Sequence, residues 1–243
     1  MQNFFLSPAL GRPEGEGHAA AKTLVEVGIP AARKAGIQII WLNWGLSRDD
    51  LEGLPPNLWR AFGVRVVDEI GGGGESQRVE SREERTERGI GLPLGDVILE
   101  DGTMIDAGDM LMQNQWNTAL YEPLQTAYSQ SLNTPLPDVR FHKSRISGLW
   151  GYTDCQAFLE EKGIRTLLFG GINTDQCVLG TLQDAASKGW DTVLLRDGCG
   201  TASPGFAREC VEFNCRKSWG FGSSCGDLWR GVEGMERDSE EEL

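Results

Sequence analysis

This 243-residue chain has few of the residues from which metal and redox sites are built. It contains only two histidines, and none of its six cysteines form a C-x-x-C pair. The spacing therefore argues against a zinc ribbon and against a thioredoxin-type site. We expect no metal and no cofactor. The cysteines are Cys155, Cys177, Cys199, Cys210, Cys215 and Cys225.

Positive charge and long apolar runs are also scarce. The 23 Lys and Arg residues face 36 Asp and Glu residues, so the formal net charge is -13. Such a surface repels a phosphate backbone or an anionic membrane, so nucleic acid and membrane are not expected as partners. The sequence has no apolar run of about 18 residues and no basic start followed by an apolar stretch. Cysteines in this number in a large chain suggest a reduced, cytoplasmic protein.

The apolar runs that are present alternate with helix-like stretches. This alternation predicts an α/β fold: a Rossmann-like, doubly wound parallel sheet of about six strands with helices on both faces. Ligands would bind at the carboxyl ends of the strands. One domain, residues 1–243, accounts for the length. The expected strands are 36–44, 139–144, 166–171 and 191–197, and the expected helices include 152–163, 174–189 and 204–220.

Four segments depart from this alternation of strands and helices. Pro30 should kink or divide the first helix, and residues 71–89 read as a polar excursion. Residues 99–111 look like a hairpin with Asp101-Gly102 as its turn. The acidic ending, 233–243, suggests a frayed, solvated tail.

The stretch "FGGINTDQCV" holds the first candidate for chemistry, Cys177. It follows a strand-like run closed by two glycines and precedes a helical pattern with Thr174 as N-cap and Gly189 as stop. A first-turn position favours a thiolate, and the backbone N–H groups there can face an oxyanion. The alternative is that Cys177 is a small hydrophobe that fills the core.

A nucleophilic cysteine needs a base or a cation beside it. His18 lies in a small, polar, mobile-looking stretch and is a poor candidate. His142 and Lys143 end a predicted strand, and strand alternation puts them on opposite faces, so one of the two can point toward Cys177. Lysine can serve if burial lowers its pKa, and it also supplies a cation for the thiolate.

"FHKSRISGLWG", followed by a helix and by "LLFGGINTDQCVLGTLQDAASKGWDTVLLRDGCGT", resembles the isochorismatase-like cysteine hydrolases. These include nicotinamidases, carbamoylsarcosine amidases and ureidoacrylate amidohydrolases. The resemblance covers most of the chain, from "MQNFF" to "SWGFGSSCGDL". It implies a parallel sheet of about six strands, in agreement with the pattern above.

The resemblance also implies roles for individual residues. Cys177 would attack a carbonyl, Lys143 would stabilise the thiolate and assist proton transfer, and an acyl thioester would then be hydrolysed. A non-proline cis peptide would fall at Ile172-Asn173, so that the Asn173 and Cys177 N–H groups form the oxyanion hole. The expected pocket residues are Gln2, Phe4, Trp44, Trp116, Trp150 and Ile172. For each tryptophan, ordinary packing is an equally good reading.

The sequence departs from the family pattern in two places, one of which bears on the substrate and the other on the N-terminus. Nicotinamidases of this family bind a metal through an Asp and His cluster, which two isolated histidines cannot reproduce, so that activity is disfavoured. The family's first strand ends in a catalytic Asp directly before a segment like "MQNFF", and this chain starts at Met1 of that segment. We therefore expect an N-terminally shortened form of a longer, active protein.

The leading hypothesis is a cysteine-dependent hydrolase that cleaves a C–N bond in a small amide, carbamoyl or ureido compound. One alternative is hydrolysis of an isochorismate-type vinyl ether. The other is a catalytically silent homologue that binds a ligand or serves as an oligomer subunit, because the acid is missing. In each case the partners are a small molecule and further copies of the chain in a homo-oligomer.

Overall fold

The computed structural model describes residues 1–63 and 89–241, and its parallel strands form two separate sheets. In the first sheet β1 (Ile40–Trp44) pairs with β4 (Val139–Lys143), in a register that sets Trp44 opposite Lys143. The second sheet has the order β5-β6-β7. Its strands are Thr166–Ile172, Asp191–Gly200 and Phe221–Ser223. The polar excursion expected at 71–89 lies outside the described residues except for Gly89.

The break between the two sheets differs from the expected sheet of about six strands. Among the described residues, two parallel strands lie in one sheet and three in the other. Residues of β1 and β5 line the same cavity, and no backbone pairing connects these two strands. The four strand segments expected from the sequence are present, so the difference concerns the continuity of the sheet.

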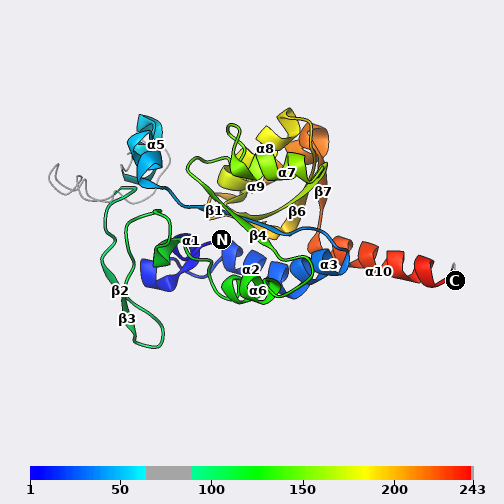
Figure 1. The fold of residues 1–243 in the computed structure, drawn as a ribbon, viewed down its shortest axis with the longest axis horizontal. Helices are drawn as coiled ribbons and strands as arrows, with labels where there is room; N and C mark the ends of the chain where they lie inside the picture. Colours follow the sequence, from blue (N-terminus) through cyan, green and yellow to red (C-terminus); the bar gives the residue numbers. More distant parts are fainter. Residues whose placement is uncertain (64–88, 242–243) are drawn as a thin grey trace.

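Helices cover both faces of the strands, which confirms the doubly wound α/β prediction (Figure 1). On one side, α7 and α8 pack on apolar residues of β1, β4 and β5, and α8 and α9 pack on β6. On the other side, α2 and α6 enclose Trp41 of β1. The bounds are α2 Glu16–Thr23, α3 Ile29–Lys34, α6 Leu124–Ser131, α7 Asp154–Glu161, α8 Leu179–Ser187, α9 Gly205–Asn214 and α10 Cys225–Glu241.

The first long helical segment changes its form directly before Pro30 and continues through that residue. Between α2 and α3 the chain forms a wider turn, η2 (Leu24–Gly28), in which the Ile29 N–H donates to Leu24 O, five residues back. Proline has no N–H, and its ring collides with the carbonyl one turn earlier in a regular α-helix. A widened turn directly before Pro30 fits both constraints.

The expected hairpin is present. β2 (Asp96–Ile98) and β3 (Met104–Asp106) pair antiparallel, and Gly102 adopts a φ of 83° in the turn between them. Glycine is the residue best suited to that conformation. The remaining helical segments of the described residues are α1 Asn3–Leu6, η1 Pro8–Leu10, α4 Arg48–Glu52, α5 Pro56–Gly63, η4 Trp116–Thr118, η5 Thr174–Val178 and η6 Cys215–Trp219.

The acidic ending differs from the frayed tail that its composition suggested. Residues 233–241 continue α10, which runs to Glu241. Within the described ranges, no helix combines the length and the apolar character needed to cross a bilayer.

Candidate active site

Cys177 lies where β5 passes into the helical segment η5 and then into α8. Asn173, and not the expected Thr174, occupies the N-cap position: its backbone is extended, and its carbonyl oxygen accepts from the N–H groups of Gln176 and Val178. The Thr174 Oγ1 is buried and has no hydrogen-bond partner. The helical turns therefore begin one residue earlier than predicted, and Cys177 is in the first of them.

Lys143 is the residue that β4 presents to Cys177. Its Nζ lies 3.5 Å from the Cys177 Sγ and donates to the carbonyl oxygens of Arg145 and Ile146, each at 2.7 Å. Lys143 is buried, whereas the preceding His142 is exposed. Strand alternation thus separates the two candidates as expected, and it selects the lysine.

The environment of Lys143 changes its acidity. Burial lowers the pKa of Lys143 from 10.5 to about 8, and the neighbouring Cys177 opposes that shift. The ammonium also lies 3.8 Å from the centroid of the Trp44 ring, where the π face stabilises a cation. At neutral pH the ammonium is therefore retained, but it gives up its proton far more readily than an ordinary lysine.

Trp44 contacts both members of this pair, because its Nε1 donates to the Cys177 Sγ at 3.3 Å. Gln2 fixes the backbone of Trp44 from both sides: its Nε2 donates to Trp44 O at 2.7 Å, and its Oε1 accepts from Trp44 N at 3.0 Å. The same Nε2 donates to Thr118 O at 2.8 Å. Gln2, which we expected in the pocket, thus holds Trp44 in position with all of its polar atoms.

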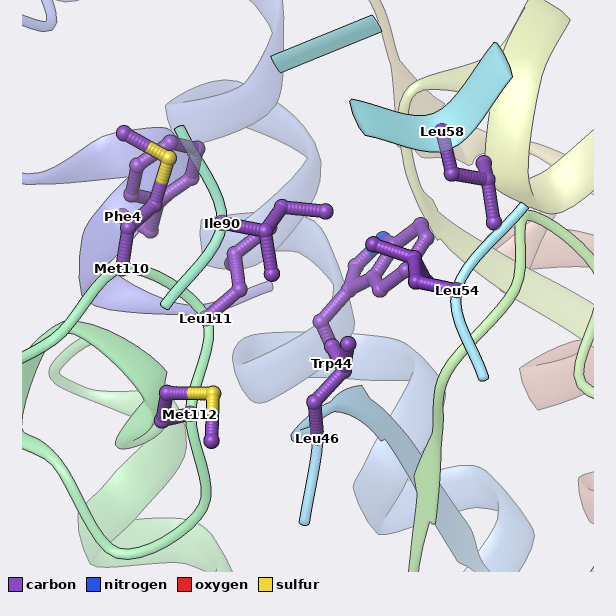
Figure 2. Close-up of a cluster of buried hydrophobic side chains, with 9 residues drawn as sticks. All are labelled: Phe4, Trp44, Leu46, Leu54, Leu58, Ile90, Met110, Leu111 and Met112. Atoms are coloured by element: carbon purple, nitrogen blue, oxygen red, sulfur yellow. The ribbon is translucent and has the colours of Figure 1, made fainter. Parts of the chain in front are cut away.

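A cluster of buried apolar side chains lies on one side of the thiol. Figure 2 shows this cluster around Trp44, and Cys177 and Phe62 pack against it. Phe4, an expected pocket residue, is part of it. Most of the others were not predicted from the sequence, and they lie on turns, on loops and on α5. The cluster consists of Phe4, Trp44, Leu46, Leu54, Leu58, Ile90, Met110, Leu111 and Met112.

The other two expected tryptophans are not members of this cluster. Trp116 is half-buried in η4, where its carbonyl oxygen accepts from Asn3 Nδ2 at 2.9 Å. Trp150 is 52 % exposed, and the Arg145 guanidinium lies 4.8 Å from its ring centroid. The structure therefore brings Trp44 alone of the three into contact with the thiol.

The Ile172-Asn173 peptide bond is cis, as the resemblance implies. Ile172 lines the cavity between β1 and β5 together with Lys143 and Cys177. The Asn173 side chain donates to Gln176 Oε1 at 3.4 Å. An oxyanion hole made of the Asn173 and Cys177 N–H groups stays a prediction.

Neither a third catalytic side chain nor a metal centre is seen in the described parts of the chain. No carboxylate there pairs with the Lys143 Nζ, and no group of three or more His, Cys, Asp or Glu side chains is placed to hold a metal ion. His18 lies in α2 instead of a mobile stretch, with its Nε2 donating to Leu6 O at 2.9 Å and its Nδ1 accepting from Gly15 N.

The six free cysteines differ in environment, and this predicts a selective reaction. Burial raises the pKa of Cys155 to about 11 and those of Cys199 and Cys225 to about 12, and it also raises the pKa of Cys215. We expect limiting iodoacetamide at neutral pH to label Cys177 first in native protein, because an ammonium lies beside its sulfur. Peptide mapping measures the order. The exposed Cys210 is the internal reference, and faster labelling of Cys210 than of Cys177 would contradict the expectation.

A thiol beside a buried ammonium, at the carboxyl ends of parallel strands, is a site suited to nucleophilic chemistry. Comparison with known proteins agrees with this class. A family model for the isochorismatase domain matches residues 110–211, a range that contains Lys143 and Cys177.

Several curated relatives are named as ureidoacrylate amidohydrolases. RutB of Caulobacter vibrioides is 33 % identical over 122 residues, which cover 50 % of this chain and 50 % of that protein. The matched region thus spans about half the length of the Caulobacter vibrioides relative. RutB of Caulobacter segnis is 27 % identical over 236 residues, covering 94 % of this chain and 81 % of the relative.

Solved structures show the same fold. The nicotinamidase PncA of Bacillus subtilis matches with a TM-score of 0.60 and 18 % identity over 91 % of this chain and 94 % of that one. N-carbamoylsarcosine amidase of Thermoplasma acidophilum matches with a TM-score of 0.57 and 15 % identity over 93 % and 92 %. The matched segment and these relatives show that the chain is similar to isochorismatase-like hydrolases, and the solved structures show that it shares their fold.

Proposed function

We propose that this protein is a cysteine-dependent hydrolase that cleaves a C–N bond in a small amide, carbamoyl or ureido compound through a thioester. The observation that carries the proposal is the 3.5 Å contact between the Cys177 Sγ and the Nζ of the buried Lys143. A buried ammonium stabilises the thiolate, which is the reactive form of cysteine. The Trp44 Nε1 adds a second donor to the same sulfur.

In the first half-reaction the thiolate attacks the substrate carbonyl carbon and forms a C–S bond. The carbonyl π electrons move to oxygen, and the Asn173 and Cys177 N–H groups stabilise that oxyanion. When the tetrahedral intermediate collapses, the C–N bond breaks and the nitrogen leaves with a proton. Lys143 is suited to deliver that proton, because its pKa of about 8 lies close to neutral.

In the second half-reaction water attacks the thioester carbonyl, with the neutral Lys143 amine accepting a proton from it. The C–S bond then breaks, the acid product leaves and the thiolate is restored. The two steps together consume one water and release one amine or ammonia and one acid, and they require no redox partner. Lys143 begins and ends the cycle as the ammonium.

Two observations support the substrate class. The curated relatives are named for hydrolysis of ureidoacrylate, and two of the fold neighbours are named for nicotinamide and carbamoylsarcosine. Each of these names describes a small compound with a carbonyl carbon bonded to nitrogen. The cavity that Lys143 and Cys177 line is otherwise bounded mainly by apolar side chains, Ile172 among them, which favours a substrate with an apolar part.

A silent homologue that only binds a ligand is the second candidate, and one observation favours it. In the described part of the chain no carboxylate pairs with Lys143, so the third member of the implied triad is not supplied there. Hydrolysis of a vinyl ether is the remaining enzymatic alternative. That reaction proceeds by protonation of carbon and needs no covalent bond to Cys177.

A screen for ammonia release tests the proposal. Wild-type protein is incubated with a panel of amides, carbamoyl compounds and ureides, and each hit is repeated with Cys177→Ala and with Cys210→Ala. We expect at least one compound to be hydrolysed by the wild type and by Cys210→Ala but not by Cys177→Ala. A hit that survives Cys177→Ala would exclude the thioester route.

We also propose that the protein is a homo-oligomer in solution. Several large apolar side chains are exposed on the monomer, and surface of this kind commonly lies in subunit contacts. Light scattering is expected to give a mass of at least twice 26.7 kDa. A single species at the monomer mass over the micromolar range would contradict the expectation. The most exposed aromatic side chains are Tyr152, Phe206, Phe213 and Phe221.

A further inference from the structure

The loop that follows β4, residues 144–152, carries the carbonyl groups that hold the Lys143 ammonium. The carbonyl oxygens of Arg145 and Ile146 each accept from the Lys143 Nζ at 2.7 Å. The loop consists of bends and a turn, without a helix or a strand. Contacts with other parts of the chain must therefore determine where these two carbonyl oxygens lie, and with them the ammonium.

Thr181 connects this loop to the turn that carries Cys177. Its Oγ1 accepts from Gly148 N at 3.1 Å and donates to Cys177 O at 2.8 Å. Thr181 is buried in α8, one helical turn after Cys177. A closed path of contacts thus runs from the Cys177 Sγ through Lys143 and the loop to Thr181, and from there back to the Cys177 carbonyl.

The loop also packs closely on α8 at two further points. A Cβ on Gly180 would lie 3.1 Å from the Ile146 Cγ2, so the helix and the loop are in near contact there. At the other end of α8 the Lys188 Nζ donates to Leu149 O at 2.5 Å. These contacts hold the loop against the helix, and the Thr181 hydroxyl adds a direct hydrogen-bonded link to the backbone of the nucleophile.

The link depends on a group that accepts and donates at once. The Gly148 N–H needs an acceptor and the Cys177 carbonyl oxygen takes a donor, and a hydroxyl supplies both. Valine has nearly the same shape as threonine but supplies neither. A buried N–H without an acceptor is costly, so the loop would shift until Gly148 finds another partner. The Lys143 ammonium is bonded to the same loop and would move away from the sulfur with it.

We propose that Thr181 is a positioning residue that keeps the Lys143 ammonium beside the Cys177 thiolate by joining loop 144–152 to α8. The inference rests on the proposed role of Cys177 as nucleophile. Thr181 acts through Lys143, and no bond or proton of the hydrolysis is assigned to it.

Three variants test the role of the hydroxyl. Thr181→Val removes it, and Thr181→Ser keeps it while removing the methyl group. Thr192→Val is the matched control, because Thr192 is also buried and its Oγ1 donates to Trp219 O at 2.7 Å. Thr192 lies near the start of β6, whereas Cys177 follows the opposite end of the paired strand β5. The rate of Cys177 alkylation at neutral pH, amide hydrogen exchange of residues 144–149 and the melting temperature are measured for each variant.

We expect Thr181→Val to slow Cys177 alkylation by about threefold or more and to speed exchange in 144–149 by about tenfold. Thr181→Ser should stay within about twofold of the wild type in both measurements. Thr192→Val should leave the alkylation rate unchanged even where it lowers the melting temperature. If Thr181→Val does not fold, Thr181→Ala and Thr181→Ser give the same comparison, since these two differ by the hydroxyl alone.

Two results would overturn the proposal: an alkylation rate that Thr181→Val leaves unchanged or raises, and an equal loss of rate in Thr192→Val. These measurements use no substrate, which separates this inference from the proposed hydrolysis. A wild-type Cys177 that reacts no faster than Cys210 would count against both. Fast alkylation of the wild type together with an insensitive Thr181→Val would overturn the role of Thr181 alone.

Discussion

Cys177→Ala is expected to lower kcat on any accepted amide by about 10⁴-fold or more, because the proposed thioester forms on the Cys177 sulfur. The melting temperature should change little, since the side chain is only half-buried and loses one sulfur atom. Steady-state ammonia release measures the loss of kcat, and thermal unfolding of the same variant shows whether the fold has been destabilised.

Cys210→Ala is the matched control for this change. Cys210 is an exposed thiol on α9, so its loss should leave kcat within about twofold of the wild type. Equal losses in the two variants would point to the fold and not to the nucleophile. Unchanged turnover by Cys177→Ala would remove Cys177 from the mechanism.

Lys143→Met is expected to lower kcat by about 10²- to 10⁴-fold, the range typical of a proton-transfer group. Methionine keeps the apolar stem against Trp44 but removes the charge and the donors at Nζ. The thiolate then loses its neighbouring cation, so Cys177 should be alkylated more slowly at neutral pH than in the wild type. An unchanged alkylation rate would show that Lys143 does not hold the thiolate.

The lowered pKa of Lys143 also predicts how the free energy of unfolding depends on pH. Its pKa is about 8 in the folded protein and 10.5 as the ordinary value, so between these values the unfolded chain binds one more proton and the native state gains stability as pH rises. Below pH 8 the buried charge costs the native state about 3 kcal/mol. Lys143→Met lacks this cost. Its advantage in the free energy of unfolding should therefore be largest near pH 7 and shrink toward pH 10.

The free energy of unfolding should be measured for the wild type and for Lys143→Met at each pH, and the difference between the two values should be compared. The buried thiols of Cys155, Cys199 and Cys225 have raised pKa values and make the native state less stable in alkaline solution. That effect is common to the wild type and to Lys143→Met, so it cancels in the difference. A difference that is constant between pH 7 and pH 10 would contradict the lowered pKa of Lys143.

Local patterns in the sequence predicted much of the fold. Short apolar runs located the parallel strands, and the alternation of His142 and Lys143 along β4 predicted that only one of them faces Cys177. The cap of the Cys177 segment was misplaced by one residue. Asparagine and threonine are both good N-caps, and only the hydrogen bonds made by Asn173 O distinguish them.

Long-range packing limited the prediction of the site. Gln2 was expected in the pocket. Its hydrogen bonds reach Trp44, 42 residues further along the chain, and Thr118, 116 residues further along, and local patterns do not predict such contacts. Leu54, Leu58 and Met110 reach the apolar cluster from a loop, from α5 and from a turn after β3, and local patterns do not show which distant segments meet. The break between β1 and β5 was also invisible in the strand patterns, because each strand reads the same whether or not its neighbour is present.

Trapping the acyl-enzyme would detect the proposed thioester on Cys177 itself. Wild-type protein is mixed with an excess of an accepted amide, quenched in acid within milliseconds, digested and analysed by mass spectrometry. We expect the peptide containing Cys177 to gain the mass of the acyl group, and the same peptide of Lys143→Met to gain it more slowly. Rapid turnover with no adduct on Cys177 at any quench time, in digests that preserve a synthetic thioester, would contradict this expectation.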